Sequence, residues 1–414
     1  MSARPPKNPD QRTRLPLLPP AARSRAAGLL TAAAAEGRFA LPRCTNCRTY
    51  AWPIPELCPA CLSDICLDTA PRGAVVLSAT LAEVPAEPYF RERAPWRVGL
   101  VQMAAGPSAL VHLHPAAGTG DQVRLTLMLD RAGQAVLHAG PKEEVSMAAD
   151  PQWQEMVADP RGRRILITDA RHICALPLTR ALLEAGASEI TLGLPEAWKT
   201  FADRSDLRGL PGVRLEPLDL NSDRSVQDLA AQIAGKVEIL INTADVLRPG
   251  GLLGPRAPVE AKAAMEVVGF GLLRLARSFG PAMAGRGADG GRGAVAWVNL
   301  LSVFGRAPVP ELAGYGAAHA AALAFSLALR AELGRGGVRL MTALTGPTED
   351  GWFQTFPSPH VSGKALASAI VDGLHRGLEE VVIGDVARDL VARLAENPKA
   401  VERELTQGRI GGAA

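Results

Sequence analysis

The sequence predicts a multidomain protein in which a short cysteine-rich segment and an all-β domain precede an α/β domain with a parallel sheet. Its 414 residues are enough for two or three domains. Short runs of alternating or β-branched residues, separated by Gly and Pro, extend from Gly73 to Pro141 and predict about five strands. Beyond Arg164 short apolar strands alternate with longer helical segments, which is typical of βαβ units.

Composition excludes several classes of protein. With 47% apolar residues, 21% charged residues and a net charge of +3, the chain is globular and not disordered, and nothing indicates a nucleic-acid partner. The uncharged stretch Leu312–Leu329 is rich in alanine and predicts a buried helix, so no membrane association is expected. Residues 1–20 are rich in proline, lack the apolar run of a secretory signal, and predict a disordered tail and a cytoplasmic protein.

The cysteine-rich segment contains two C-x-x-C pairs with ten residues between them. Each pair is a tight turn that places two thiolates on one side of the chain, and two such turns make a closed tetrahedral site. A structural Zn²⁺ suits this site best, and iron remains the alternative. The predicted ligands are Cys44, Cys47, Cys58 and Cys61.

The remaining elements follow in order. A helix over Ala21–Glu36 ends at Gly37, and residues 142–162 resemble an interdomain linker because they show no apolar period. The α/β domain is expected over residues 163–407. Its predicted strands are Arg164–Thr168, Glu189–Leu194, Val213–Pro217, Val237–Asn242, Ala294–Leu301, Val338–Leu344 and Val381–Ile383.

The first half of the chain resembles a known family through Gly37-Arg38-Phe39, the two cysteine pairs, and the segments Arg72–Thr80, Ala94–Val101 and Gly118–Val123. These are similar to the zinc-ribbon/OB-fold, acyl-CoA-associated proteins that accompany thiolases. The resemblance implies a rubredoxin-like zinc ribbon over residues 21–70 and an OB-fold β-barrel over residues 71–141. It also implies a thiolase-like partner enzyme that acts on an acyl-CoA, with no chemistry in the module itself.

The second half resembles the short-chain dehydrogenase/reductase family. Asp219-Leu220-Asn221 follows the third strand, as the family's acidic motif does, and Ser302 precedes Tyr315 by thirteen residues, as in that family. Asn242-Thr243-Ala244-Asp245 ends the fourth strand, where the family carries Asn-Asn-Ala-Gly. The resemblance implies a Rossmann domain that dimerises through two long helices, Val259–Met283 and Ala313–Leu333. The positions it assigns are Ser302, Tyr315 and His319 to catalysis, and Thr168, Asp219 and Asn242 to the cofactor.

Several motifs depart from the family pattern. The phosphate loop Thr168–Ala175 contains no glycine, and Asp169 and Ile173 stand where a pyrophosphate would lie. Leu194-Pro195 replaces the residue that holds the ribose. NAD(P) binding is therefore not expected.

The catalytic set is altered as well. His319 stands in place of the family's lysine, and Glu266 stands in place of its asparagine. A neutral histidine stabilises a tyrosinate less well than an ammonium does. The catalytic residues are thus predicted to be residual and inactive.

Three functions remain open at this stage. The first is a non-catalytic scaffold subunit of a thiolase- or aldolase-type acyl-CoA complex, assembled as a homo- or hetero-oligomer through its Rossmann domain. The alternative is an NAD(P)-dependent 3-hydroxyacyl-CoA dehydrogenase or 3-ketoacyl-CoA reductase fused to a thiolase-docking module. The third is a sensor that binds an acyl-CoA or a nucleotide in the Rossmann cleft.

Overall fold

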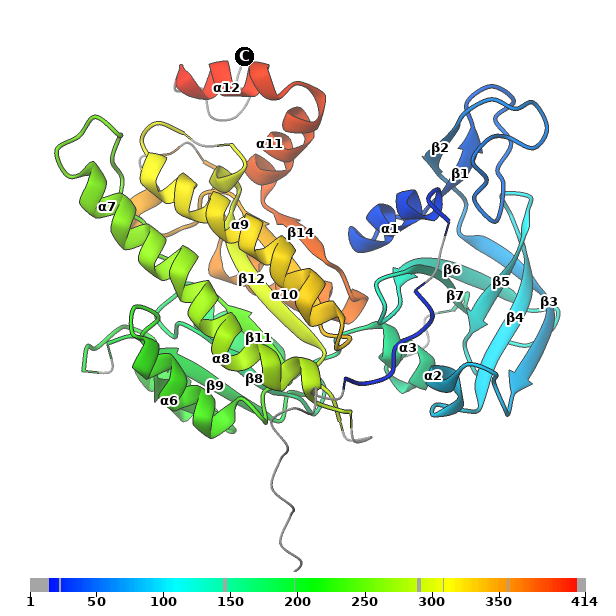
Figure 1. Cartoon of the computed structure of the whole chain (residues 1–414), viewed down its shortest axis with the longest axis horizontal. Helices are drawn as coiled ribbons and strands as arrows, with labels where there is room; N and C mark the ends of the chain where they lie inside the picture. Colours follow the sequence, from blue (N-terminus) through cyan, green and yellow to red (C-terminus); the bar gives the residue numbers. More distant parts are fainter. Residues whose placement is uncertain are drawn as a thin grey trace, which may run out of the picture.

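The computed structural model describes residues 15–21, 24–143, 147–196, 198–288, 292–307, 309–354, 356 and 358–407. Most of the tail predicted for residues 1–20 lies outside these residues. The chain forms two lobes, one built by the N-terminal helix, ribbon and barrel and the other by the α/β domain (Figure 1).

The N-terminal helix and ribbon are small. Helix α1 (Ala27–Ala35) begins later than predicted and is followed by Gly37, whose φ of +71° suits a residue without a Cβ. Strands β1 (Ala40–Cys44) and β2 (Ile65–Thr69) pair antiparallel and enclose the cysteine segment. A two-stranded ribbon of this size is marginal in water without additional support.

The β domain is a closed five-stranded barrel, as the strand pattern predicts, in the order β3-β4-β5-β7-β6. Alternate residues such as Val101, Leu113 and Leu125 point inward and are completely buried. The strands are β3 (Gly73–Ala82), β4 (Trp96–Met103), β5 (Ser108–Leu113), β6 (Gln122–Leu129) and β7 (Ala135–Pro141), and α2 (Pro88–Arg91) precedes β4.

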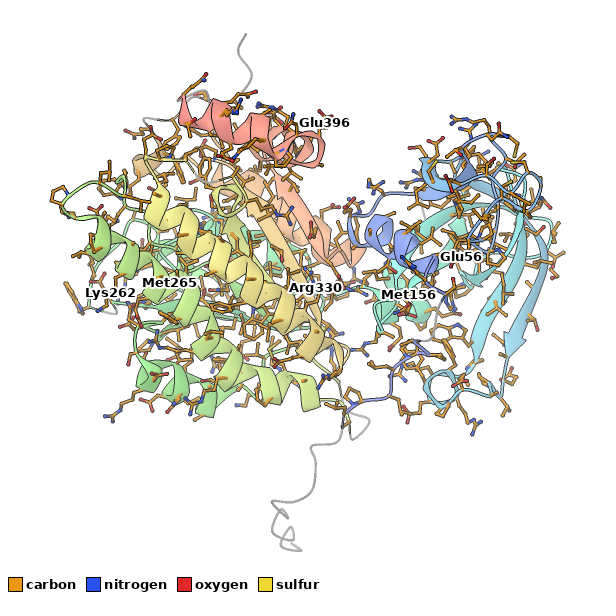
Figure 2. The ribbon with its side chains drawn as sticks, turned by 45° about the horizontal axis from the view of Figure 1, so that its top comes forward. Glu56, Met156, Lys262, Met265, Arg330 and Glu396 are labelled. Atoms are coloured by element: carbon orange, nitrogen blue, oxygen red, sulfur yellow. The ribbon has the colours of Figure 1, made fainter. Side chains whose placement is uncertain are left out.

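The segment between the lobes contains helix α3 (Pro151–Met156) after a 3₁₀ turn (Met147–Ala149). Buried Gln152 accepts a hydrogen bond from the Arg97 backbone N–H and donates one to the Arg97 carbonyl oxygen, which fixes α3 to the barrel. Met156 lies where the two lobes meet (Figure 2). Its carbonyl oxygen accepts a hydrogen bond from Arg339 in the α/β domain.

The α/β domain contains a seven-stranded parallel sheet in the order β10-β9-β8-β11-β12-β13-β14. The observed ends differ from the predicted ones by no more than two residues, for example Ile239–Asn242 against Val237–Asn242. The strands are β8 (Arg164–Ile167), β9 (Glu189–Leu194), β10 (Val213–Pro217), β11 (Ile239–Asn242), β12 (Ala296–Ser302), β13 (Arg339–Thr345) and β14 (Glu380–Ile383).

Helices cover both faces of this sheet (Figure 1). The helix predicted over Val259–Met283 contains a π-helical stretch, Met265–Phe270, between α7 and α8. Within the described ranges, no helix is both long and apolar enough to cross a membrane. The helices are α4 (Ala175–Glu184), α5 (Arg204–Gly209), α6 (Asp223–Ile233), α7 (Ala257–Ala264), α8 (Gly271–Gly285), α9 (Ala313–Gly334), α10 (Gly363–Arg376), α11 (Asp385–Glu396) and α12 (Pro398–Thr406).

The order in which successive strands are added to the sheet changes direction between β8 and β11. These two parallel strands are neighbours although two strands separate them in sequence. In open α/β sheets ligands bind outside the carboxyl ends of strands at such a point. The fold therefore places the candidate site at the ends of β8, β11 and β12.

Candidate functional site

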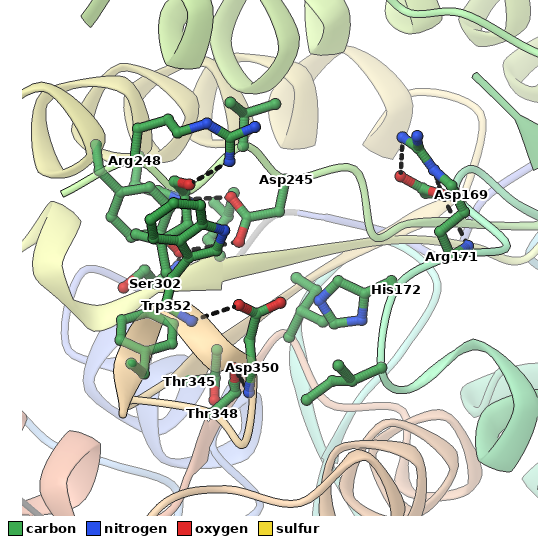
Figure 3. Close-up of a pocket in the computed structure, with 18 of the residues that line it drawn as sticks. Asp169, Arg171, His172, Asp245, Arg248, Ser302, Thr345, Thr348, Asp350 and Trp352 are labelled. Atoms are coloured by element: carbon green, nitrogen blue, oxygen red, sulfur yellow. Dashed lines mark hydrogen bonds and ion pairs between the residues drawn. The ribbon is translucent and has the colours of Figure 1, made fainter. Parts of the chain in front are cut away.

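A cavity of about 450 Å³ opens at this edge of the sheet (Figure 3). The three residues assigned to catalysis, Ser302, Tyr315 and His319, all line it. Ser302 ends β12, and the other two lie four residues apart in the first turns of α9, so they project from the same face of that helix. The structure thus brings together the residues that the sequence pattern selected.

Asp245 joins these residues although it was not predicted as a site residue. The Tyr315 hydroxyl donates a hydrogen bond of 3.0 Å to Asp245 Oδ2. His319 Nδ1 accepts a hydrogen bond of 3.1 Å from the Ser302 backbone N–H, which leaves the proton of a neutral ring on Nε2. Nε2 lies 3.3 Å from Asp245 Oδ1 and donates to it. The carboxylate therefore receives two donors.

These contacts set the charge state of the site. Burial raises the pKa of Tyr315 well above its usual value, and the Asp245 carboxylate raises it further. Burial alone would raise the pKa of Asp245, but the hydrogen bond from His319 and the nearby imidazoles outweigh it, so that pKa is lowered. The site consequently rests as an ionised aspartate beside a protonated tyrosine.

Replacing Asp245 by asparagine is expected to lower the free energy of unfolding at pH 7 by roughly 1–3 kcal/mol, because hydrogen bonds to a charged acceptor are lost. A lowered folded-state pKa stabilises the chain above the unfolded pKa of about 3.9 and ceases to do so as the pH falls through the lower folded value. The difference between Asp245→Asn and wild type should therefore shrink below about pH 4. Denaturant titrations across this pH range measure it.

The matched control for this experiment is Asp228→Asn, because the Asp228 side chain is 67% exposed and pairs only with a helix neighbour. It should change stability little at any pH. A constant stability gap between wild type and Asp245→Asn from pH 7 to pH 3 would contradict the ionised-aspartate description.

Backbone N–H groups of the phosphate loop are already hydrogen-bonded to other groups of the same loop. The backbone N–H of Arg171 donates to Asp169 Oδ1, and that of Cys174 donates to His172 Nδ1. The N–H groups of His172 and Ala175 donate to the carbonyl oxygens of Asp169 and His172. A pyrophosphate needs free N–H groups at this helix start, and here four are already bonded and a carboxylate stands among them. The loop residues do not fit a dinucleotide.

The arginine of this loop is also neutralised. Arg171 pairs with Asp169 at 3.2 Å and with Glu196 at 2.7 Å, and both carboxylates line the cavity. Its charge is therefore not available to a phosphate.

The residues assigned to the cofactor do not line the cavity. Thr168 and Asn242 are buried, and the Thr168 hydroxyl donates to Asn242 Oδ1 at 2.8 Å, which ties β8 to β11 beneath the site. The Asp219 carboxylate accepts hydrogen bonds from the backbone and side chain of Asn221 within its own loop. Glu266 likewise does not line the cavity, and it pairs with Arg274.

The four cysteines of the ribbon meet at a second site. Their sulfur atoms all lie within 4.8 Å of one another, in an arrangement that could hold a metal ion. The backbone N–H groups of Asn46 and Cys47 point toward Cys44 Sγ at 3.4 Å, as expected for a knuckle that carries thiolate charge. Four sulfur ligands without an open position fit a structural Zn²⁺, which would crosslink the two loops of the ribbon.

Comparisons with protein families agree with this architecture. Residues 31–65 match the model described as "ChsH2, rubredoxin-like zinc ribbon domain", and residues 68–127 match "ChsH2, C-terminal OB-fold domain". Residues 165–357 match the short chain dehydrogenase family. The predicted combination of zinc ribbon, OB-fold and short-chain dehydrogenase-like Rossmann domain is confirmed.

Among solved structures, a short chain dehydrogenase from Burkholderia cenocepacia in complex with NADP is 28% identical, with a TM-score of 0.53. The match covers 60% of this chain and 98% of that one. A short-chain dehydrogenase from Streptomyces avermitilis is 20% identical over 59% of this chain and 95% of that one, with a TM-score of 0.48. No curated protein matches the chain.

Proposed function

We propose that this chain is a non-catalytic accessory subunit of a thiolase- or aldolase-type acyl-CoA complex, and that its dehydrogenase-like domain serves as a scaffold. The observation that supports the proposal most is Asp245, which accepts a hydrogen bond from the Tyr315 hydroxyl. Carbonyl reduction in this fold needs a tyrosine that gives its proton to substrate, whereas here the hydroxyl donates to a carboxylate that raises the tyrosine pKa. The phosphate loop, whose N–H groups are already hydrogen-bonded, also supports the proposal.

The direct test is calorimetric titration of NADH and NADPH into the full-length, zinc-loaded protein. No saturable binding in the Rossmann cavity is expected up to millimolar cofactor, because the loop N–H groups are already bonded and Asp169 repels a phosphate. An Asp169→Gly/Ile173→Gly variant is the positive comparison, since it removes the carboxylate and the branched side chain.

A second candidate is the NAD(P)-dependent 3-hydroxyacyl-CoA dehydrogenase or 3-ketoacyl-CoA reductase. It is favoured by Ser302 and Tyr315 in one cavity and by the 28% identity to a dehydrogenase solved with NADP. Micromolar binding of either cofactor to the natural chain would replace the scaffold proposal with this one, and loss of turnover in Tyr315→Phe would then establish it.

The partner would dock on the outer face of the barrel. Leu100 and Leu110 are directly paired neighbours on β4 and β5, and they are 39% and 68% exposed. Leu77, which is 47% exposed, lies in the β-bulge of β3 beside Leu100. Contiguous exposed leucines on a soluble domain indicate an interaction surface.

Replacing Leu110 by glutamate is expected to weaken capture of a co-expressed thiolase-fold partner by tenfold or more, about 1.4 kcal/mol, because the charge would be buried in the interface. The exposed side chain can change without unfolding the barrel. Leu253→Glu, on the other lobe and fully exposed, is the control and should leave capture unchanged. Equal capture by all three proteins would exclude this surface as the docking site.

Oligomerisation is assigned in this proposal to the helices α7–α9 of the Rossmann domain. Their outer surface carries exposed apolar residues, Val259, Phe270, Leu273 and Leu327. Burial of such a surface against a second copy or against an intact dehydrogenase would give the homo- or hetero-oligomer. A cytoplasmic location is part of the same proposal.

A further inference from the structure

A second hollow lies on the barrel and shares no lining residue with the Rossmann cavity. It has a volume of about 670 Å³ and is lined by the start of β3, the end of β4, the start of β6 and Lys142. Its depth arises from small residues, because a Cβ added at Gly73 would meet only the Ala104 Cβ, at 3.9 Å. Gly73 pairs with Arg124 across the ladder, so a cation stands directly beside the hollow.

The charges around this hollow are all of one sign. Arg72, Arg124 and Lys142 line it, and no carboxylate does. In the part of the chain that the structure describes, none of the three forms an ion pair with a carboxylate. Lys142 donates only to the Gln122 side-chain oxygen, at 3.1 Å, and the Arg72 guanidinium lies over the Phe39 ring at 5.5 Å.

Three unneutralised cations around one hollow cost stability in the free protein. Burial lowers the pKa of Arg72, and the like charges of Arg124 and Arg376 lower it further. Arg376 itself is paired with Asp372, whereas the cations of the hollow have no such partner among the residues that the structure describes. An arrangement that destabilises the free chain is expected where a bound anion supplies the missing charge.

We propose that this hollow, defined by Arg72, Arg124, Lys142, Gln102 and Gln122, binds the diphosphate group of a small molecule. Three cations match two linked phosphates in number and charge, and the two amides can donate further hydrogen bonds to phosphate oxygens. The volume suits a nucleotide-sized ligand. A nucleic-acid strand is disfavoured because the lining contains no aromatic side chain for base stacking.

The inference does not depend on the proposed accessory function, since it concerns different residues. Free pyrophosphate, ADP, CoA and NADP all contain the same group, and they are the arms of the experiment. Each is titrated into the full-length protein by calorimetry at two salt concentrations. Pyrophosphate alone is expected to bind saturably and more weakly at high salt. If one of the nucleotides binds more tightly than free pyrophosphate, that nucleotide is identified as the source of the diphosphate group.

Two variants test the site. Arg124→Gln/Lys142→Gln should weaken pyrophosphate binding by at least tenfold, while the melting temperature of the free protein stays equal or rises because repulsion is removed. Gly73→Leu keeps every charge but fills the hollow, and should also weaken binding of the nucleotides. The control is Arg224→Gln, whose side chain is 91% exposed on α6 of the other lobe.

Three outcomes would overturn the proposal. These are absence of saturable pyrophosphate binding to wild type, equal weakening in Arg224→Gln and the double variant, and nucleotide binding that the double variant leaves unchanged. The last outcome would place the nucleotide elsewhere, for example in the Rossmann cavity. Failure of the accessory function is read separately, from partner capture and from NADH and NADPH titration of Arg124→Gln/Lys142→Gln, which keeps the natural Rossmann loop but lacks two cations of the hollow.

Discussion

Serine in place of Cys44 is expected to abolish the fold of the ribbon and release its metal. Cys44 is completely buried, and its sulfur lies 3.4 Å from that of Cys61. Two short strands and their loops bury too little apolar surface to fold alone, whereas structural zinc contributes about 10–16 kcal/mol of apparent binding free energy in small ribbons at pH 7. Loss of one ligand removes most of this contribution.

The measurement is zinc content by atomic absorption together with limited proteolysis between residues 40 and 70. Cys66→Ser is the control, because Cys66 lies outside the metal cluster and its sulfur contacts only the Arg43 carbonyl oxygen. Wild type and this control should each hold one equivalent of zinc and resist cleavage. One equivalent of tightly held zinc in Cys44→Ser, with wild-type resistance, would contradict the assignment. One equivalent of iron in the wild-type protein would favour the alternative metal.

The second large effect is expected at the joint between the lobes. The Arg339 guanidinium donates to the carbonyl oxygens of Met156, Leu129 and Asp130 at 2.6, 2.9 and 3.0 Å. Arg339→Leu leaves all three acceptors without this donor at the interface between the lobes. Since a hydrogen bond to a charged group contributes about 1.5–3 kcal/mol, three such bonds correspond to a loss of roughly 4.5–9 kcal/mol.

Calorimetric unfolding checks this prediction. The wild-type lobes should unfold together, and the variant should show two transitions as the lobes separate. The stability of Arg339→Lys should lie between that of wild type and that of Arg339→Leu, because one ammonium cannot reach three acceptors with the geometry of a guanidinium. Arg335→Leu, at an exposed position directly after α9, is the control and should behave as wild type. A single wild-type-like transition in Arg339→Leu would show that other contacts hold the lobes.

Most of the architecture could be predicted from local signals. Strand and helix periodicity placed the parallel strands within two residues, and the C-x-x-C spacing identified the sulfur cluster. Periodicity and cysteine spacing both involve residues that are close together in sequence, so they can be recognised without the structure. Helix α3 could not be predicted in this way because it is short and is stabilised by partners such as Arg97 that lie far away in the chain.

The candidate site was predictable only in part, for the same reason. Ser302, Tyr315 and His319 have a recognisable spacing, whereas Asp245 is seventy residues from Tyr315 and acts through a contact that only the fold creates. A signal was present: an acidic residue stands where the resembled family has glycine. Its role as a hydrogen-bond acceptor for the tyrosine hydroxyl could be recognised only from the geometry. The occupied N–H groups of the phosphate loop were equally invisible in the sequence.

The joint between the lobes has a consequence for assembly. Besides Arg339, the Glu379 backbone N–H donates to the Ala35 carbonyl oxygen at 2.9 Å, so α1 is fastened to the sheet lobe as well. With these contacts the connection between the two lobes is rigid. The entropy of fixing one lobe relative to the other is lost when the chain folds, before any partner binds. Two proteins bound to opposite lobes would therefore meet at one distance and orientation, with a high effective concentration. The chain would hold two bound partners at a fixed distance, and lengthening the segment before α3 would change which partners can contact each other.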